Sequence, residues 1–359
     1  MSWAIQAGPV LPVLLAGFVA ALLVSFVATP WILRYVREHR ILDHPDARRV
    51  HKQPLPRGGG VAVVVAFLLV GGGLALVRGG LPGVDISKPI PDVNLAGLFV
   101  GAALATIIGA LDDRYDLRAR WQFLGQLVLA GIAVASGITV AFISNPFASP
   151  ANIQFPYVVG VAFTVVWIVG MINSLNFIDG LDGLSSGIAL IAALTLGVLS
   201  LTQQVNQPMV AILCFVLGGG LLGFLRWNFH PAVIFQGTAG VMFLGYTLGV
   251  LAILGSAKVI VALLVLAVPI IDTFWVIVRR VSEGRSPFSP DRGHIHHLLL
   301  DLGLSHRSTV LLIYVVCATL GLMSLFVSST IGVIAFVGAL VVLGVVAFVL
   351  RRGPSEAAS

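Results

Sequence analysis

Charged residues are scarce in this chain: Asp, Glu, Lys and Arg make up 10% of its 359 residues, whereas hydrophobic residues make up 58%. A soluble globular domain carries about 25% charged residues. The mean hydropathy of +1.03 is correspondingly high. The composition therefore excludes an ordinary soluble enzyme and favours a protein whose solvent is lipid.

Cysteine is also rare, and several common signatures are missing. Cys214 and Cys317 both fall inside apolar runs, which argues against a disulfide framework or a cysteine-ligated metal site and favours apolar filling. The sequence has no Walker lysine motif, dinucleotide-binding glycine fingerprint or nucleophile elbow. The net charge of +6 comes without the interleaved aromatic or base-reading elements of nucleic-acid binding. We therefore expect no nucleic-acid partner.

Long apolar runs, by contrast, are abundant. A helix that crosses a bilayer needs about 20 apolar residues. We predict an all-α fold, a polytopic transmembrane helical bundle that forms one domain over residues 1–350, followed by a short cytoplasmic tail over 351–359. The first run lacks a basic region before it and leads into arginines, so we interpret it as a retained span and not as a signal peptide. About eleven spans can be cut from the sequence, near 8–33, 58–77, 93–111, 123–143, 156–175, 184–203, 209–225, 240–255, 258–278, 308–327 and 330–350.

The basic residues are distributed unevenly about these runs. If the N-terminus lies outside, 18 of the 21 Lys and Arg residues fall on one side of the membrane, and all eight His and 13 of the 15 acids fall in the loops or span ends of that side. By the positive-inside rule this side is cytoplasmic. Lipid anchoring explains the basic residues but not the histidines and acids. We therefore predict a membrane protein with a cytoplasmic C-terminus and its chemistry at the cytoplasmic face.

The first cytoplasmic loop, residues 43–60, has three prolines and three glycines, which favour fixed turns over a helix. Its basic residues, among them Arg48 and His51, would suit an electropositive shelf for phosphates. Anchoring to lipid headgroups is the alternative reading for such a loop.

The second loop places Asp112 and Asp113 side by side at the end of a span. Two carboxylates at a helix C-terminus oppose the helix dipole and repel each other. A Mg²⁺ ion, which favours oxygen ligands, would relieve that cost. The alternative is that the arginines of the same loop, Arg120 among them, compensate the acids and that both are structural.

The third segment, residues 173–183, breaks a hydrophobic run with two amides and two acids. Asp179 and Asp182 are three residues apart and would share one face of a helical turn. Polar groups at the membrane edge are costly, so a functional site that includes Asn176 is the preferred interpretation. A cap or a turn would explain one of the acids but less easily all four polar groups.

The fourth segment, residues 287–297, carries three histidines beside Arg292. His294, His296 and His297 could bind a transition metal or hydrogen-bond phosphate oxygens. Zinc is the weaker interpretation, because no cysteine lies nearby.

Together these segments resemble the polyprenyl-phosphate N-acetylhexosamine-1-phosphate transferase family, in the family's order over about residues 30–306. Asp112-Asp113 is similar to its paired-aspartate motif, and residues 176–183 to its Asn-x-x-Asp-Gly-x-Asp-Gly motif. Residues 228–235 resemble the segment leading into its fourth signature. His294-Ile-His-His297 resembles the His-x-His-His of the branch that uses UDP-N-acetylglucosamine. The phospho-N-acetylmuramoyl-pentapeptide transferase branch, which has three consecutive histidines there, ranks second.

The resemblance implies transfer of N-acetylhexosamine-1-phosphate, with N-acetylglucosamine favoured, from a UDP-sugar to undecaprenyl or another polyprenyl phosphate. UMP would be released at the first membrane step of a cell-envelope polysaccharide such as lipopolysaccharide or teichoic acid. It implies Mg²⁺ as cofactor, with Mn²⁺ as the alternative, and leaves a homodimer open. The residues it assigns are catalytic Asp112, Asp113 and Asp179; substrate-binding Arg48, His51, Arg120, Asp182, Arg292, His294, His296 and His297; and metal-binding Asn176, Asp113 and the position of Thr238.

The sequence departs from the family at that last position. The family pattern Gly-Asp-x-Gly-Ser, whose Asp is a magnesium ligand, reads Gly-Thr-Ala-Gly-Val over residues 237–241. A neutral hydroxyl replaces a carboxylate, so Thr238 should weaken a magnesium site. Either the remaining acids and the substrate phosphates hold the metal, or this chain is an impaired or non-catalytic member that binds lipid-linked sugars.

A transporter is the rival from another functional class. Transporters place ionisable groups near the bilayer midplane, often within internal repeats. Here Asp272 alone lies well inside a span, and no repeat is visible. Asp272 is either functional or hydrogen-bonded to Thr273 or a neighbouring helix, and the sequence leaves both readings open.

Overall fold

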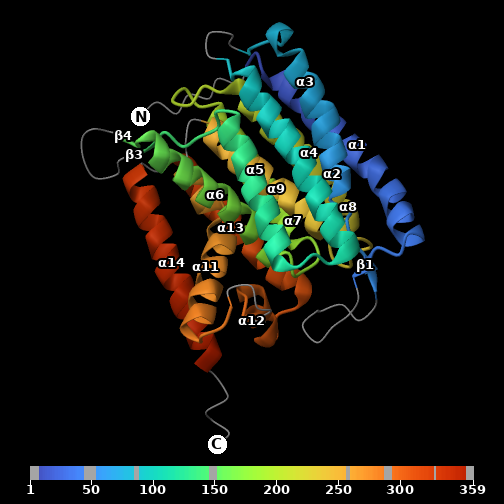
Figure 1. Cartoon of the computed structure of the whole chain (residues 1–359), viewed down its shortest axis with the longest axis vertical. Coiled ribbons are helices and arrows are strands. Elements are labelled where there is room, and N and C mark those ends of the chain that lie inside the picture. The colour runs from blue at the N-terminus through green and yellow to red at the C-terminus, as the bar shows by residue number, and fades with distance from the viewer. Residues whose placement is uncertain are drawn as a thin grey trace, which may run out of the picture.

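The structure is a computed structural model that describes residues 8–43, 54–84, 89–144, 152–255, 259–286, 293–326 and 329–352. Helices make up most of the described chain (Figure 1). The strands form two short antiparallel pairs, β1 (Leu42–Asp43) with β2 (Leu55–Pro56) and β3 (Phe142–Ser144) with β4 (Asn152–Gln154). The predicted helical class is confirmed.

Every expected span overlaps a helix or consecutive helices, although the span near 123–143 extends past the helix that ends at Ala135 and into β3. A π-helical turn at Phe67–Gly71 joins α2 to α3, and α12 is a short helix between two expected spans. The helices are α1 (Leu11–Glu38), α2 (Val61–Ala66), α3 (Gly72–Leu76), α4 (Asp92–Tyr115), α5 (Ala119–Ala135), α6 (Tyr157–Ile178), α7 (Leu184–Ser200), α8 (Pro208–Asn228), α9 (Gly237–Leu254), α10 (Val259–Val265), α11 (Ala267–Ser282), α12 (Ile295–Asp301), α13 (His306–Phe326) and α14 (Ser329–Arg352).

Length and composition identify the chain as a multi-pass membrane protein. Six of the described helices are each long and apolar enough to cross a bilayer, namely α1, α4, α6, α8, α9 and α13. The other expected spans correspond to shorter helices, to consecutive helices or to α14. The count of eleven spans, the external N-terminus and the single domain over 1–350 stay predictions.

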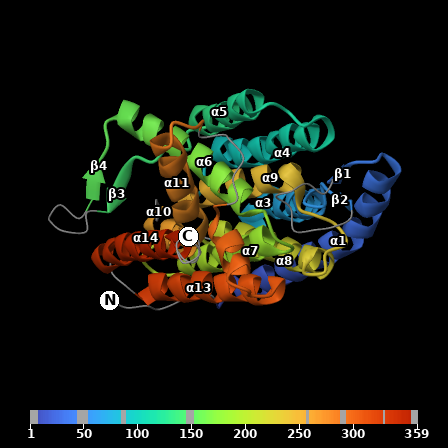
Figure 2. The same ribbon diagram turned by 90° about the horizontal axis from the view of Figure 1, so that it is seen from below.

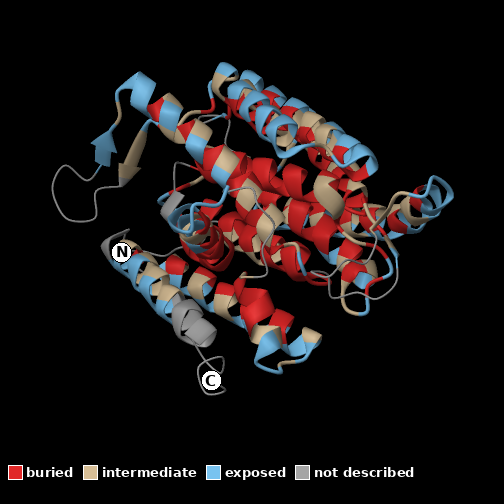
Figure 3. Ribbon diagram, turned by 60° about the horizontal axis from the view of Figure 1, so that its bottom comes forward, coloured by how far each residue is buried: buried red, intermediate tan, exposed pale blue. Residues whose placement is uncertain are grey.

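Helices α8 and α9 form the centre of the bundle. They are mostly buried, whereas α1, α4, α6 and α13 keep much of their apolar surface on the outside (Figures 2 and 3). Glycines let α1 lie directly on α8: a Cβ on Gly219 would be 2.1 Å from the Phe18 carbonyl oxygen, and one on Gly223 would be 2.3 Å from that of Leu22. Small residues at such interfaces are typical of helices packed in lipid.

The polar segments meet at one end of this bundle. The C-terminus of α4 contacts the N-terminus of α9, and the turn between α6 and α7 contacts the loop after α8 and the first residue of α13. In Figure 1 this is the end that carries β1 and α12. The fold therefore brings together motifs that are far apart in the sequence.

Candidate active site

The strand-like segment before α2 lies against the segment that begins α9. The Phe235 amide donates to the Pro56 carbonyl at 2.8 Å, and the Gly59 amide donates back to the Phe235 carbonyl at 2.8 Å. A Cβ on Gly60 would lie 2.3 Å from the Cα of Gly240, so only glycine permits this approach. The pairing fixes Arg57 beside the N-terminus of α9.

Asp113, from the last turn of α4, caps α9. Its Oδ1 accepts the Thr238 amide at 2.8 Å, and its Oδ2 accepts the Ala239 amide at 3.1 Å. These amides belong to the first turn of α9, where backbone donors lack partners within the helix and the dipole favours an anion. The carboxylate side chain is only 3% exposed. The α9 N-terminus therefore stabilises one of the two acids.

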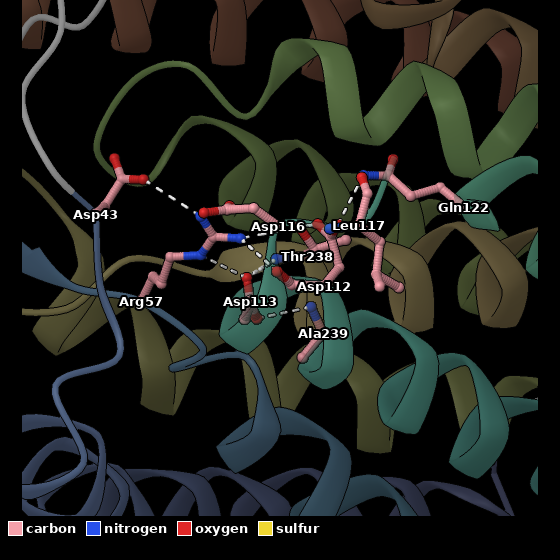
Figure 4. Close-up of polar contacts among 9 residues, drawn as sticks. All are labelled: Asp43, Arg57, Asp112, Asp113, Asp116, Leu117, Gln122, Thr238 and Ala239. Carbon is pink, nitrogen blue, oxygen red and sulfur yellow. Dashed lines mark hydrogen bonds and ion pairs between the residues drawn. The ribbon is translucent and has the colours of Figure 1, made fainter. Parts of the chain in front are cut away.

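Arg57 compensates the paired acids (Figure 4). Its Nε donates to Asp113 Oδ1 at 2.8 Å, and its Nη2 lies 3.7 Å from Asp112 Oδ2. Its Nη1 donates to Asp116 at 3.2 Å and lies 3.6 Å from Asp43. Burial disfavours the charge of the guanidinium, but these carboxylates outweigh that effect and raise the pKa of Arg57. The expected compensation thus comes from Arg57 and not from Arg120, whose guanidinium lies over the Trp121 ring.

Asp112 receives its hydrogen bonds from three other groups. Its Oδ1 accepts the Leu117 amide at 3.0 Å and the Gln122 side-chain amide at 2.7 Å. Its Oδ2 accepts the Thr238 hydroxyl at 2.7 Å. Thr238 therefore acts here as a donor to the paired acids, through both its hydroxyl and its backbone amide.

This donor set does not fit a magnesium ion at the aspartate pair. An ionised carboxylate offers about four lone-pair positions. Asp112 and Asp113 each accept three hydrogen bonds, and Arg57 adds its positive charge. The residue at the family's metal-ligand position, Thr238, directs its hydrogen at Asp112. The Mg²⁺ or Mn²⁺ cofactor stays a prediction that this arrangement does not favour.

Asp179 follows α6 directly, and Asn176 lies in the last turn of that helix. The Ser185 hydroxyl, from the first turn of α7, donates to Asp179. Burial raises the pKa of Asp179 to about 7, and the negative charges of Asp113 and Asp182 add to that rise. Asp179 is therefore a carboxyl group that can change its protonation state near neutral pH.

Asp182 is held by two histidines that the sequence analysis did not select. Its Oδ2 lies 2.6 Å from His230 Nδ1 and accepts the Ala232 amide at 3.1 Å, while its own amide donates to His306 Nε2 at 2.9 Å. The two imidazole rings stack 4.1 Å apart. Asp182, His230 and His306 each offer one nitrogen or oxygen atom that could bind a metal, and these atoms lie within 4.8 Å of one another. Because His306 Nε2 already accepts the Asp182 amide, it is not available as a metal ligand in this arrangement. The three residues therefore form a hydrogen-bonded cluster and not a metal site.

Asp272 positions the histidine helix α12. Its carboxylate lies 2.6 Å from His294 Nδ1 and accepts the Ile295 amide at 2.8 Å. The alternative partner, Thr273, has a buried hydroxyl without a hydrogen-bond partner among the described residues. Asp272, the acid expected inside a span, thus caps α12. The position of this acid inside a span is the feature that would suit a transporter, and the hydrogen bonds give the acid a structural role instead.

His296 points at the turn that carries the acids. It is 1% exposed, and both of its ring nitrogens lack hydrogen-bond partners among the described residues. A Cβ on Gly180 would lie 2.3 Å from His296 Nε2. Burial, followed by the neighbouring histidines, lowers the pKa of His296 well below its usual value. It is therefore a neutral imidazole whose hydrogen-bonding capacity the described residues do not use. His297 is buried beside it, with the two rings 4.3 Å apart.

Three of the predicted residues, Arg48, His51 and Arg292, lie outside the described residues. The remaining ones are brought to one end of the bundle, although Arg120 takes no part in the contacts of the acids described above. The sequence analysis missed His230 and His306 as site residues, and it included Arg57 only among the basic residues of the first loop, as part of a shelf for phosphates. Arg57 and His230 lie in segments that the sequence analysis had selected, residues 43–60 and 228–235, so their positions could have indicated a role. His306 lies in no such segment, and only its residue type pointed to a role.

Comparison with known proteins shows similarity over most of the chain. The family described as Glycosyl transferase family 4 matches residues 95–256. The chain is 34% identical to the probable undecaprenyl-phosphate N-acetylglucosaminyl 1-phosphate transferase of Bacillus subtilis, over 84% of this chain and 82% of that protein. It is 36% identical to the decaprenyl-phosphate N-acetylglucosaminephosphotransferase of Mycolicibacterium smegmatis, over 97% and 91%. It is 27% identical to the undecaprenyl-phosphate alpha-N-acetylglucosaminyl 1-phosphate transferase of Escherichia coli K12, over 78% and 74%.

Proposed function

The chain belongs to glycosyl transferase family 4, and we propose that it transfers N-acetylglucosamine-1-phosphate from UDP-N-acetylglucosamine to undecaprenyl phosphate or a related polyprenyl phosphate. UMP is the second product, and the lipid-linked sugar begins a cell-envelope polysaccharide. The chain is thus a membrane transferase that acts on a polyprenyl phosphate.

One observation supports this function above all. Asp113, Asp179, Asp182 and His296 come from three segments of the sequence and are gathered at one end of the bundle. The buried, neutral His296 has ring nitrogens that make no hydrogen bond to any described residue, and it lies beside the turn of Asp179 and Gly180. Such convergence of acids and an unpartnered imidazole is expected of a site that takes a polar substrate.

An apolar pocket of about 360 Å³ beside the aspartates suits the lipid acceptor. Arg57 and Asp113 lie among its lining residues, and Trp31 and Tyr35 of α1 line it on the outer side of the bundle. Trp31 is 68% exposed, so this wall faces the region where lipid would lie. A polyprenyl chain could enter here with its phosphate at the polar end.

The chemistry requires little base catalysis. A phosphate monoester has a second pKa near 6, so the acceptor is mostly dianionic at neutral pH. Its oxygen forms a bond to the β-phosphorus of the donor, the bond from that phosphorus to the bridging oxygen breaks, and UMP leaves with the electron pair. Positioning and charge compensation dominate such a transfer. Neutral His296 would donate to a phosphate oxygen, and Asp182 with its histidines would position the uridine diphosphate.

The location follows the charge distribution. We assign the chain to the bacterial inner membrane, with the N-terminus outside and the site at the cytoplasmic face, because 18 of its 21 basic residues fall on that side in the predicted topology. A homodimer stays a prediction.

UMP release from the purified protein tests the function. We expect release that requires both UDP-N-acetylglucosamine and undecaprenyl phosphate, and that falls by on the order of 10² in His296→Ala because a phosphate contact is lost. Asp301→Asn, an exposed acid at the end of α12, is the matched control. Preference for UDP-N-acetylmuramoyl-pentapeptide in competition would move the chain to the other branch of the family.

A non-catalytic member of the family is the second candidate, favoured by Thr238 in place of the ligand aspartate. Binding of UDP-N-acetylglucosamine without UMP release, under every condition tested with divalent metal and acceptor lipid, would support it.

A further inference from the structure

We propose that Arg57 is a built-in counter-cation for Asp112 and Asp113, and that in this chain the aspartate pair does not hold a divalent metal ion. The part of the argument that concerns activity rests on the proposed transferase function. The part that concerns metal binding stands on the contacts alone.

The guanidinium occupies the position of a shared cation. It approaches Asp113 to 2.8 Å and Asp112 to 3.7 Å, and it also donates to the Asp112 main-chain carbonyl at 3.2 Å. The Arg57 side chain is 12% exposed, and those of Asp112 and Asp113 are 7% and 3% exposed. Charges this close and this little exposed are weakly screened by solvent. One acid is therefore neutralised by a covalently tethered cation.

Hydrogen-bond donors occupy most of the lone-pair positions of the Asp112 and Asp113 carboxylates. The three donors to Asp112 are the Leu117 amide, the Gln122 amide and the Thr238 hydroxyl. The two α9 amides and Arg57 account for Asp113. About one lone-pair position remains on each residue, whereas Mg²⁺ demands near-ideal octahedral geometry with several oxygen ligands at about 2.0–2.1 Å.

Thr238 is consistent with an aspartate pair that holds no metal, because its hydroxyl donates to Asp112. A carboxylate at this position would meet Asp112 at the 2.7 Å contact that the hydroxyl now makes as a donor. Two carboxylates at that distance repel each other unless a cation lies between them. The threonine, by contrast, is stable next to Asp112 without a metal. The guanidinium thus neutralises one negative charge of the pair, and the Thr238 hydroxyl stabilises the Asp112 carboxylate by a hydrogen bond.

Binding of Mn²⁺, measured by electron paramagnetic resonance on the purified protein in detergent with MnCl₂ as the only ligand, is the direct test. We expect no saturable binding by the unaltered chain in the micromolar range. Arg57→Met should gain binding by at least about tenfold, because removal of the fixed cation leaves the carboxylates uncompensated. Thr238→Asp should gain binding as well, because it adds a charged oxygen ligand.

The controls decide where the ion binds. Asp112→Asn combined with Thr238→Asp should lose the gain, and Thr238→Val should show none. Micromolar Mn²⁺ binding by the unaltered chain that disappears in Asp112→Asn would overturn the proposal. If Arg57→Met does not fold, the proposal is still tested by Mn²⁺ binding to three proteins: the unaltered chain, Thr238→Asp, and Thr238→Asp combined with Asp112→Asn.

UMP release after removal of divalent ions with EDTA separates this inference from the proposed function. We expect the unaltered chain to keep most of its activity in EDTA. A loss of more than tenfold that Mg²⁺ restores, together with Mn²⁺ binding that disappears in Asp112→Asn, would contradict the proposal while confirming the transferase. Absence of UMP release with and without divalent ions would instead contradict the transferase, and the Mn²⁺ measurement would still test the inference.

Discussion

Replacing Asp113 by asparagine tests how the site is held together. The change removes the negative charge that Arg57 contacts at 2.8 Å, and it places an NH₂ group against one of the two α9 amides that the carboxylate now accepts. One donor then faces another donor inside a buried site. The fold should therefore lose stability at the junction of α4 and α9.

The magnitude follows from those contacts. Loss of a helix cap costs about 1 kcal/mol, and removal of one partner from a buried ion pair costs about 3–5 kcal/mol. Arg57 keeps its contacts with Asp112 and Asp116, so the second figure is an upper limit. We expect a loss of about 2–4 kcal/mol in the free energy of unfolding.

Denaturant unfolding of the purified protein in detergent would measure this loss in the free energy of unfolding. A double-mutant cycle of Asp113→Asn with Arg57→Met would measure the coupling between the two residues. Residues in direct contact show coupling of about 0.5–3 kcal/mol, and we expect a value in the upper half of that range. The matched control is Arg78 with Asp92, an ion pair at the surface, for which a coupling of about 0–1 kcal/mol is expected. If Asp113→Asn stays within about 0.5 kcal/mol of the unaltered chain, the cap and the ion pair do not stabilise the fold.

Three further predictions concern acids and glycines. Because burial raises the pKa of Asp179 to about 7, the folded chain keeps that proton at pH values where the unfolded chain has lost it, so this group's contribution to stability falls as pH rises from about 4 to 7. Asp179→Asn should flatten that stretch of a plot of melting temperature against pH, and an unchanged slope would contradict the assignment. Asp272→Asn should lower the rate of UMP release by about tenfold, because it weakens the hold on α12, whereas Thr273→Val should leave the rate unchanged; equal rates for both would refute the positioning role. Gly60→Ala should abolish folded protein in a size-exclusion assay, because its Cβ would lie 2.3 Å from a backbone atom, whereas Gly73→Ala, with nothing within 4 Å, should fold normally.

The spans and the motif-bearing segments could be predicted because they are local properties. Each long apolar run contains a helix or consecutive helices, since a backbone in lipid must satisfy its hydrogen bonds within the segment. The acids and histidines of residues 111–120, 173–183 and 287–297 interrupt those runs, and that cost is visible in the sequence alone. The helical class and the family therefore followed from residues read in order.

The partners of the polar side chains could not be predicted, because tertiary packing chooses them. Asp113 bonds to an amide 125 residues away, Asp182 to an imidazole 124 residues away, and Asp272 to His294 and not to its neighbour Thr273. Thr238 shows the limit most clearly. A hydroxyl can donate or accept, and its sequence position indicates only that a carboxylate is missing. That it donates to Asp112, beside an arginine from the first loop, depends on the close approach of Gly60 to α9, because a hydrogen bond forms only where the packed backbone brings two groups within about 3 Å.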